Sequence, residues 1–366
     1  MNELEALVQL AATPHLGAIK IRLLLQHFGS ALDALNGDLA EIAQFPGFGE
    51  KIIGSLRQSR TSDFGRREVE LASRYQVNLI PYTSPDYPKS LLEIHDRPVL
   101  LYVKGQIKES DRQSIAVIGT RQMSVYGGEM AEKFSQDLAA AGLTVVSGLA
   151  RGIDTAAHLG ALRKGRTLAV IGSGLGDIYP AENSALAKAI VDQGRGALIS
   201  EFPMMTPPDR QNFPQRNRIV SGMTMGTVLI EAPQKSGAMI TMEKALSQQK
   251  KLFALPGRAD SENFKGNHYL IKKGLAQLVE SGRDVIESYT NLFHHPDPKS
   301  RVAVARPYLE KEEEQFLRLL PAQELSFDEI AGLTQLPIMK LNVLLMSLML
   351  KKVIKEFPGK IYKKLE

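Results

Sequence analysis

Five arginines follow short apolar runs, where forked guanidinium groups could bind phosphate oxygens in pairs. Each run has the length and composition of a buried strand, and each arginine stands behind such a run or in the loop that continues from it. The carboxyl ends of parallel strands meet at one edge of a sheet, so we expect the five side chains to share that edge. A single loop arginine is usually solvated, but five on one edge indicate a polyanionic ligand. They are Arg121, Arg151, Arg210, Arg216 and Arg218.

Small and polar residues stand at the same strand ends. Glycine, serine and threonine leave backbone N–H groups and helix N-termini open to phosphate oxygens. Such groups follow several successive strands, whereas a mononucleotide needs only one phosphate site. The pattern therefore predicts an extended ligand with repeating phosphates. The candidates are Gly119, Thr120, Ser124, Ser236 and Gly237, with Asn217 between two of the arginines.

Phe213 is the aromatic residue in the middle of the basic stretch. Proteins that bind single strands combine a basic groove with an aromatic face on which a base stacks, worth ~1–3 kcal/mol per base. Base stacking and packing in the core are both open for Phe213 on spacing alone.

Enzymatic chemistry has little support in this sequence. The glycines of 172–176 lack the third position of the dinucleotide-binding fingerprint, and no Walker-type Gly-Lys-Ser/Thr occurs. Glu201 and Glu231 end predicted strands without a visible nucleophile or base partner, so either could pair with an arginine instead. His158 lies four residues after Asp154 in a predicted helix, where a hydrogen bond across one turn or a helix cap is expected. We predict no catalytic residue.

Cofactor and metal sites are likewise not expected. The chain has no cysteine, which excludes disulfides, thiolate metal sites and cysteine nucleophiles. His294 and His295 are adjacent in a Pro-containing stretch without further ligands, so we predict a solvated linker there.

The apolar runs themselves predict the fold. They are continuous rather than alternating, which is typical of strands covered on both faces, and helical stretches separate them. This is the pattern of an α/β, doubly wound parallel sheet of the extended Rossmann type. The predicted strands are 115–118, 144–146, 168–171, 197–199, 227–230, 252–255 and 277–279, and two further runs at 77–80 and 99–103 could also be strands.

We divide the chain into four segments. Residues 1–62 form a helical head, 63–290 the extended Rossmann-like domain, 291–306 a linker and 307–366 a winged-helix-like tail. Two similar glycine-containing stretches in the head, at 14–20 and 46–52, resemble the hairpins of helix-hairpin-helix units. They could expose N–H groups to a DNA phosphate or could serve helical packing alone.

The tail combines predicted helices around 311–320, 326–334 and 338–350 with strands at 353–357 and 360–362, joined by a turn at Pro358-Gly359. The last of these helices is mostly apolar and has one basic residue, Lys340, whereas a helix that reads the major groove needs polar and basic side chains. The composition of 338–350 therefore favours packing or contact with a protein partner. The lysines of the predicted hairpin could contact a DNA backbone or could simply be solvated.

Length and charge are consistent with these segments. The chain has 366 residues, 43% of them hydrophobic, which is enough for two or three domains. A formal net charge of +5 permits a polyanionic partner without requiring one. No basic segment leads into an apolar N-terminal stretch, and no apolar run approaches the ~20 residues of a membrane span. We therefore expect a cytoplasmic protein with no membrane partner.

At these motifs the chain closely resembles the DprA (Smf) family of DNA-processing proteins. The resemblance is strong from about 85 to 275, and its combination of motifs is highly specific. The sequence has Thr120 where the family usually has Ser, which keeps the hydroxyl, and Arg97 where Pro is common. The matching stretches include Val-Ile-Gly-Thr-Arg at 117–121, Ser-Gly-Leu-Ala-Arg-Gly-Ile-Asp at 147–154, Ser-Glu-Phe-Pro at 200–203, Phe-Pro-Gln-Arg-Asn-Arg-Ile-Val at 213–220 and Ala-Leu-Pro-Gly at 254–257.

The resemblance implies a non-enzymatic homodimer that binds single-stranded DNA and loads the RecA recombinase onto it in natural transformation and recombination. It implies phosphate contacts for Arg121 and Arg210, base stacking for Phe213, and a place in the same pocket for 216–218. The competing hypothesis is a nucleotide phosphoribohydrolase of the lysine-decarboxylase-like group, whose glycine motif Gly226-Thr227 and Glu231 match only faintly. A plain nucleotide-sensing module is the third.

Overall fold

The computed structural model describes the whole chain except residues 290–308, 322, 324, 352, 358–359 and 365–366. The chain forms two compact units, residues 1–292 and 293–366, and the helical head belongs to the same unit as the large sheet. The predicted linker, 291–306, lies entirely outside the described residues. The boundaries of the four predicted segments stay predictions.

The head is a cluster of short helices around apolar side chains such as Leu10, Ile21, Leu24 and Leu56, which are fully or almost fully buried. Asn2 begins the first helix with a capping box, and Gly17 and Gly49 precede the second and fifth. The helices are α1 (Glu3–Ala11), α2 (Ala18–Phe28), α3 (Ala31–Asn36), α4 (Leu39–Ile42), α5 (Glu50–Arg60) and α6 (Phe64–Arg74). Helix α6 lies beyond the predicted end of the head at residue 62 but packs on α1, so the head means α1 to α6 from here on.

A nine-stranded sheet in the order β1-β2-β6-β5-β4-β3-β7-β8-β9 forms the centre of the first unit. The run from β6 to β9 is parallel throughout, which confirms the predicted fold class. The strands are β1 (Asn78–Pro81), β2 (Leu100–Gly105), β3 (Ser114–Ile118), β4 (Thr144–Ser147), β5 (Thr167–Val170), β6 (Gly196–Ser200), β7 (Gly226–Leu229), β8 (Lys251–Ala254) and β9 (Gln277–Leu278).

The edge formed by β1 and β2 departs from a purely parallel sheet. β1 pairs with β2, and β2 with β6, in antiparallel register. The chain passes from β2 to β3 through a short connection that contains only a 3₁₀ turn, Glu109–Arg112, and no helix crosses the sheet there. β2 therefore ends at the edge of the sheet where β3 begins, whereas a β2 parallel to β3 would need a crossover between them.

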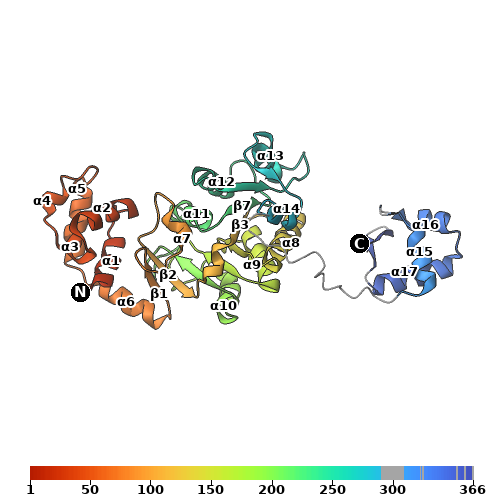
Figure 1. Ribbon diagram of the computed structural model, residues 1–366, viewed down its shortest axis with the longest axis horizontal. Helices are drawn as coiled ribbons and strands as arrows, with labels where there is room; N and C mark the ends of the chain where they lie inside the picture. The colour runs from red at the N-terminus through yellow and green to blue at the C-terminus, as the bar shows by residue number, and fades with distance from the viewer. Residues whose placement is uncertain (290–308, 322, 324, 352, 358–359, 365–366) are drawn as a thin grey trace. The chain divides into compact units, whose positions relative to one another are not determined.

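Helices cover both faces of the sheet (Figure 1). Alternate strand residues explain this: Leu101 and Val103 of β2 pack in one apolar cluster, whereas Leu100 and Tyr102 pack in another. The first cluster includes residues of α7 (Lys89–Leu92), α11 (Asn212–Gly222), α12 (Gly237–Ser247) and α13 (Lys265–Lys272). The other helices are α8 (Val125–Ala140), α9 (Ile153–Lys164), α10 (Ser184–Asp192) and α14 (Gly282–Glu287).

The strand order reverses beside β3, because β4 lies on one side of it and β7 on the other. In open α/β sheets such a reversal opens a crevice at the carboxyl ends of the strands. The loops after β3 and β7 touch at this point, where the Thr120 N–H donates to the Glu231 carbonyl at 2.7 Å.

The second unit combines α15 (Lys311–Leu319), α16 (Phe327–Thr334) and α17 (Ile338–Leu350) with a small sheet in the order β10-β12-β11. Its strands are β10 (Leu325–Ser326), β11 (Ile354–Phe357) and β12 (Ile361–Lys364), and β10 is an addition to the predicted hairpin. The predicted turn, Pro358-Gly359, lies outside the described residues. The layout confirms the winged-helix-like prediction.

Within the described parts of the chain, no single helix has the length and apolar composition needed to cross a membrane. The pair Phe327–Thr334 and Ile338–Met349 meets both criteria only when taken together, and it is bent by 113°.

Candidate nucleic-acid interface

A cavity of about 700 Å³ opens at the reversal of the strand order. The loops that follow β3, β4 and β7 and the first turns of α11 line it, so residues far apart in the sequence meet there. Nine of the twelve predicted site residues are among those lining it: Gly119, Thr120, Arg121, Arg210, Phe213, Arg216, Asn217, Ser236 and Gly237.

The loop that carries Arg121 is held from two sides. The Ile153 N–H donates to the Thr120 carbonyl at 3.2 Å, opposite the bond from Thr120 to Glu231. Gly152 has φ of +76°, and a Cβ there would lie 2.4 Å from the Thr120 carbonyl oxygen. Only glycine combines that backbone conformation with so close an approach. The loop geometry therefore fixes where Arg121 leaves the backbone.

Arg121 lies over the ring of Phe213, with its guanidinium carbon 4.8 Å from the ring centroid. The ring of Tyr179 is 6.2 Å from that of Phe213. Phe213 is only half-buried, and one side of it packs so closely on Gly172 that a Cβ there would lie 2.8 Å from the ring. Phe213 thus packs partly against the protein and still lines the cavity.

Exposed cations line the same cavity as this ring. Arg121, Arg210 and Lys235 all line the cavity and are exposed, and none forms an ion pair with an acid among the residues that the structure describes. Lys235 is absent from the predicted site because it follows no strand directly; its place one residue before Ser236-Gly237 was the available signal. Such cations attract phosphate groups over the whole width of a cavity.

Helix α12 begins at the cavity. Ser236 has the extended backbone of an N-cap residue, but its hydroxyl makes no capping hydrogen bond and has no partner among the described residues. The first N–H groups of α12 therefore lack a side-chain cap, as at helix N-termini that bind anions.

Arg216 lines the floor of the cavity, but its guanidinium donors already bind backbone carbonyls of the protein. It is 5% exposed, and its guanidinium donates to the carbonyls of Gly148 and Val170. Burial lowers the pKa of Arg216 to about 10, while the nearby Asp154 carboxylate opposes that shift. Asp154 accepts hydrogen bonds from the Gly148 and Ala150 N–H groups at 3.1 and 3.4 Å. The two residues hold the loop after β4 in place.

Three predicted site residues lie outside the cavity. Ser124 caps α8, and its hydroxyl donates to Glu231 at 2.9 Å. Arg151 is exposed, pairs with Glu182, and borders a smaller hollow shared with Arg121 and Phe213.

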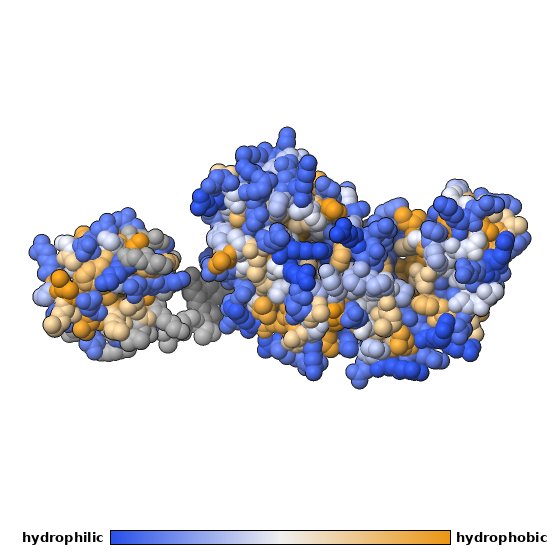
Figure 2. Space-filling view, turned by 180° about the vertical axis from the view of Figure 1, so that it is seen from behind, coloured by the Kyte–Doolittle hydropathy of each residue, from blue (hydrophilic) through white to orange (hydrophobic). Residues whose placement is uncertain are grey.

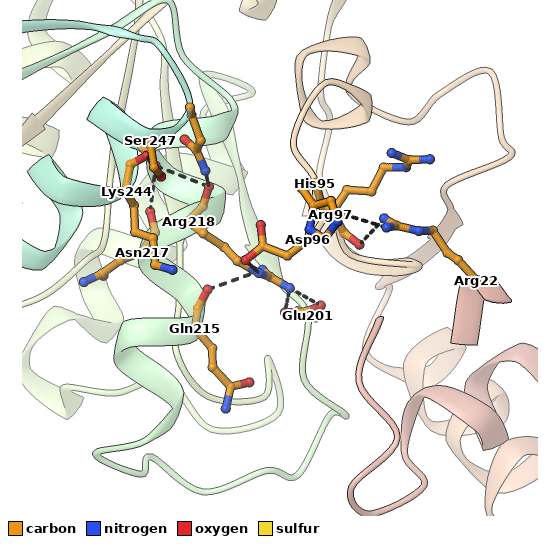
Figure 3. Close-up of polar contacts among 12 residues, drawn as sticks. Arg22, His95, Asp96, Arg97, Glu201, Gln215, Asn217, Arg218, Lys244 and Ser247 are labelled. Carbon is orange, nitrogen blue, oxygen red and sulfur yellow. Dashed lines mark hydrogen bonds and ion pairs between the residues drawn. The ribbon is translucent and has the colours of Figure 1, made fainter. Parts of the chain in front are cut away.

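Arg218 requires a correction, because it lines a different cavity, between the head and the sheet. It donates to Glu201 at 2.7 and 2.8 Å and is buried (Figure 3). Along α11, residues 213, 216, 217 and 220 share one face at helical spacing, and 218 points elsewhere. This spacing was the signal that could have separated Arg218 from its neighbours.

Glu201, Glu231 and His158 were considered above for enzymatic chemistry, and each has a structural partner. Glu231 is fully buried and accepts hydrogen bonds from Ser124 and, at 2.7 Å, from the Asn263 amide. His158 contacts Thr167 at 2.6 Å, not Asp154, and burial lowers its pKa to about 3, so the ring is neutral. No group of three or more potential metal ligands comes together within the described ranges.

Comparisons with known proteins agree on one family. The family model of DNA recombination-mediator protein A matches residues 78–290. Protein Smf of Escherichia coli (strain K12) is 40% identical over 273 residues, which is 70% of this chain and 72% of that protein. DNA processing protein DprA of Streptococcus pneumoniae (strain ATCC BAA-255 / R6) is 42% identical over 204 residues, 56% of this chain and 71% of that protein.

Two solved structures are similar as well. The X-ray structure of DprA from Streptococcus pneumoniae has a TM-score of 0.65 and 33% identity, covering 78% of this chain and 98% of that one. DNA processing protein A from Helicobacter pylori, described for its unique single-stranded DNA binding mode, has a TM-score of 0.53 and 29% identity. That comparison covers 60% of this chain and 98% of the other.

Proposed function

Because the chain belongs to the DNA recombination-mediator protein A family, we propose that it binds single-stranded DNA in the cavity at the carboxyl ends of β3, β4 and β7. One observation carries the proposal: three exposed cations, Arg121, Arg210 and Lys235, line the same cavity as the half-buried ring of Phe213, and none of them is ion-paired within the part of the chain that the structure describes. Cations along a groove follow a phosphate backbone, and an aromatic face stacks a base without regard to sequence.

All of the predicted site residues except Arg218 have a place in this arrangement. Arg121 and Arg210 bind phosphates directly, and the open N-terminus of α12 at Ser236-Gly237 binds a further one. Phe213 stacks a base. Arg216 and Asn217 form the floor, and Arg216 acts through its charge and through the loop it holds. Gly119, Thr120, Ser124 and Arg151 shape or border the site.

The role is that of a binding protein without catalytic activity. Glu201 and Glu231, the acids at the strand ends, are engaged by Arg218, Ser124 and Asn263 rather than free to transfer protons.

We further propose that the protein works in the cytoplasm as a homodimer, protects incoming single strands and loads the RecA recombinase onto them in natural transformation and recombination. Sedimentation with and without RecA, followed by a strand-exchange assay, tests these two partners.

Binding of single- and double-stranded oligonucleotides at several salt concentrations tests the central proposal. We expect preference for the single strand and an affinity that falls steeply as salt rises, because each neutralised phosphate releases counterions. Tight binding of a nucleoside monophosphate with little salt dependence would instead support a nucleotide-sensing module. Release of free base from such a monophosphate would support the phosphoribohydrolase.

A further inference from the structure

A second polar cluster, in which Arg218 of α11 contacts Glu201 and Asp96, has no residue that lines the cavity (Figure 3). Its centre is Arg218, which is 7% exposed, binds Glu201 through two hydrogen bonds and lies 3.4 Å from an Asp96 carboxylate oxygen. Glu201 stands just behind β6, at the start of the loop that leads to α11. The cluster therefore ties α11 both to that loop and to the segment that precedes β2.

The helical head reaches this cluster through Arg22 of α2. The Arg22 guanidinium donates to the carbonyl of His95 at 2.6 Å and to that of Arg97 at 3.4 Å, the two residues that flank Asp96 (Figure 3). The head thus holds the backbone on both sides of the residue whose carboxylate holds Arg218.

Glu68 of α6 makes a second attachment, to the same loop. The Glu68 residue is 4% exposed and accepts a hydrogen bond from the backbone N–H of Met204. Two further backbone bonds, from the Gly174 N–H to the Thr206 carbonyl at 2.9 Å and from the Gly176 N–H to the Met204 carbonyl at 2.8 Å, tie this loop to the one that follows β5. The chain then continues to Arg210 and Phe213.

The contact between head and loop is narrow. Cavities of about 520 and 490 Å³ flank it, and Pro203 lines both of them together with residues of the head. Apolar packing still joins the two parts, since the buried side chain of Met204 belongs to the same core as those of the head. At such a contact, polar interactions with fixed geometry determine the position of the β6–α11 loop relative to the head.

We propose that the helical head positions Arg210 and Phe213 for single-stranded DNA, with Glu68 and Arg22 as the positioning residues. The inference rests on the proposed function. The head then has a role that requires no DNA contact of its own. It fixes the position of the β6–α11 loop near its start, while Arg210 and Phe213, at the other end, line the cavity.

The test compares variants of the full chain. Glu68→Leu removes the acceptor for Met204, Glu68→Gln keeps an acceptor oxygen, and Glu70→Leu is the control at an exposed position on the same helix. Affinity is measured with a fluorescein-labelled oligo-dT. Stacking is measured with an oligo-dT containing one 2-aminopurine, whose fluorescence at saturating protein reports contact with Phe213.

We expect Glu68→Leu to weaken binding about tenfold and to reduce the 2-aminopurine quenching at saturation. Glu68→Gln and Glu70→Leu should keep both. A purely structural defect would lower the folded fraction but leave the quenching of the bound state unchanged. Arg22→Leu, which removes the donor to the His95 and Arg97 carbonyls, tests the other attachment if Glu68→Leu does not fold, and the same loss of quenching is expected.

The inference is overturned if folded Glu68→Leu and Arg22→Leu bind and quench as the wild type does, or if Glu68→Gln is as defective as Glu68→Leu. Failure of the proposed function gives a different result, because the wild type itself would then neither bind oligo-dT nor quench 2-aminopurine. That outcome would remove this inference as well.

Discussion

Arg121 and Arg210 approach the cavity from different loops, and each is expected to neutralise phosphate charge on a bound strand. Arg121 comes from the loop after β3, and Arg210 lies just before α11. Arg216 shows that position alone does not make an arginine available, because carbonyl oxygens already occupy its guanidinium. The three arginines differ in their exposure and in whether their guanidinium donors are free to bind a phosphate.

Replacing Arg121 or Arg210 by Ala should weaken single-strand binding and make it less salt-dependent. Each lost phosphate contact is expected to reduce the slope of log affinity against log salt by about 0.7. Titrations at several salt concentrations measure both quantities. Arg283→Ala on α14, far along the chain from the cavity residues and paired with Glu287, is the control. Unchanged slopes in both variants would contradict the assignment of these arginines.

Phe213→Ala should lower affinity by ~1–3 kcal/mol with little change in the salt slope, because stacking involves no counterion release. Phe213→Tyr keeps an aromatic face and should bind nearly as tightly. The same salt titrations, run beside those of the arginine variants, separate the two kinds of contact. A changed slope with unchanged affinity would exclude stacking on this ring.

The loops and strands that hold these side chains were predictable to different degrees. Continuous apolar runs such as 115–118 predicted the central strands because burial on both faces leaves no polar positions. The direction of β1 and β2 was not predictable, since a short apolar run looks the same in either direction. The partner of Arg218 depended on the face of α11 from which it leaves, and only the helical spacing of 213, 216, 217 and 220 carried that information.

In the second unit, Glu313 of α15 joins α17 through Lys351 and Ser347, with hydrogen bonds of 2.6 to 2.8 Å. The bond from Lys351 lowers the pKa of Glu313 to about 2, from an ordinary value of 4.5. A carboxyl whose pKa is lower in the folded state stabilises it above the unfolded pKa and loses that contribution as the pH falls. The packing of α15 on α17 should therefore weaken between pH 4.5 and pH 2.

Hydrogen exchange of the full chain, expressed as protection relative to intrinsic exchange at each pH, measures this loss in α15 and α17. Glu313→Gln should lower protection at neutral pH and remove much of its pH dependence. Glu314→Gln, at an exposed neighbour, should behave as the wild type does. An identical acid-induced loss in Glu313→Gln would show that other groups are responsible.

At the scale of the whole molecule, the two compact units present different surfaces. The cavity and its exposed cations belong to residues 1–292. The second unit exposes apolar side chains along α17, among them Met339 at 82%, Val343 at 65% and Met346 at 64%, and Figure 2 shows apolar patches on its surface. The one basic residue of that helix, Lys340, pairs with Glu312. We therefore place the proposed single-strand site on the large sheet, where the arginines at the strand ends lie.

Ultraviolet cross-linking of the wild-type protein to oligo-dT, followed by trypsin digestion and mass spectrometry, tests this assignment most directly. We predict a DNA adduct on the peptide 211–216, which follows Arg210, ends with Arg216 and contains Phe213. The same adduct should be lost in Phe213→Leu. Adducts found only in the head, residues 1–74, or in the tail, residues 307–366, with none on 211–216, would contradict the claim that the cavity binds the strand.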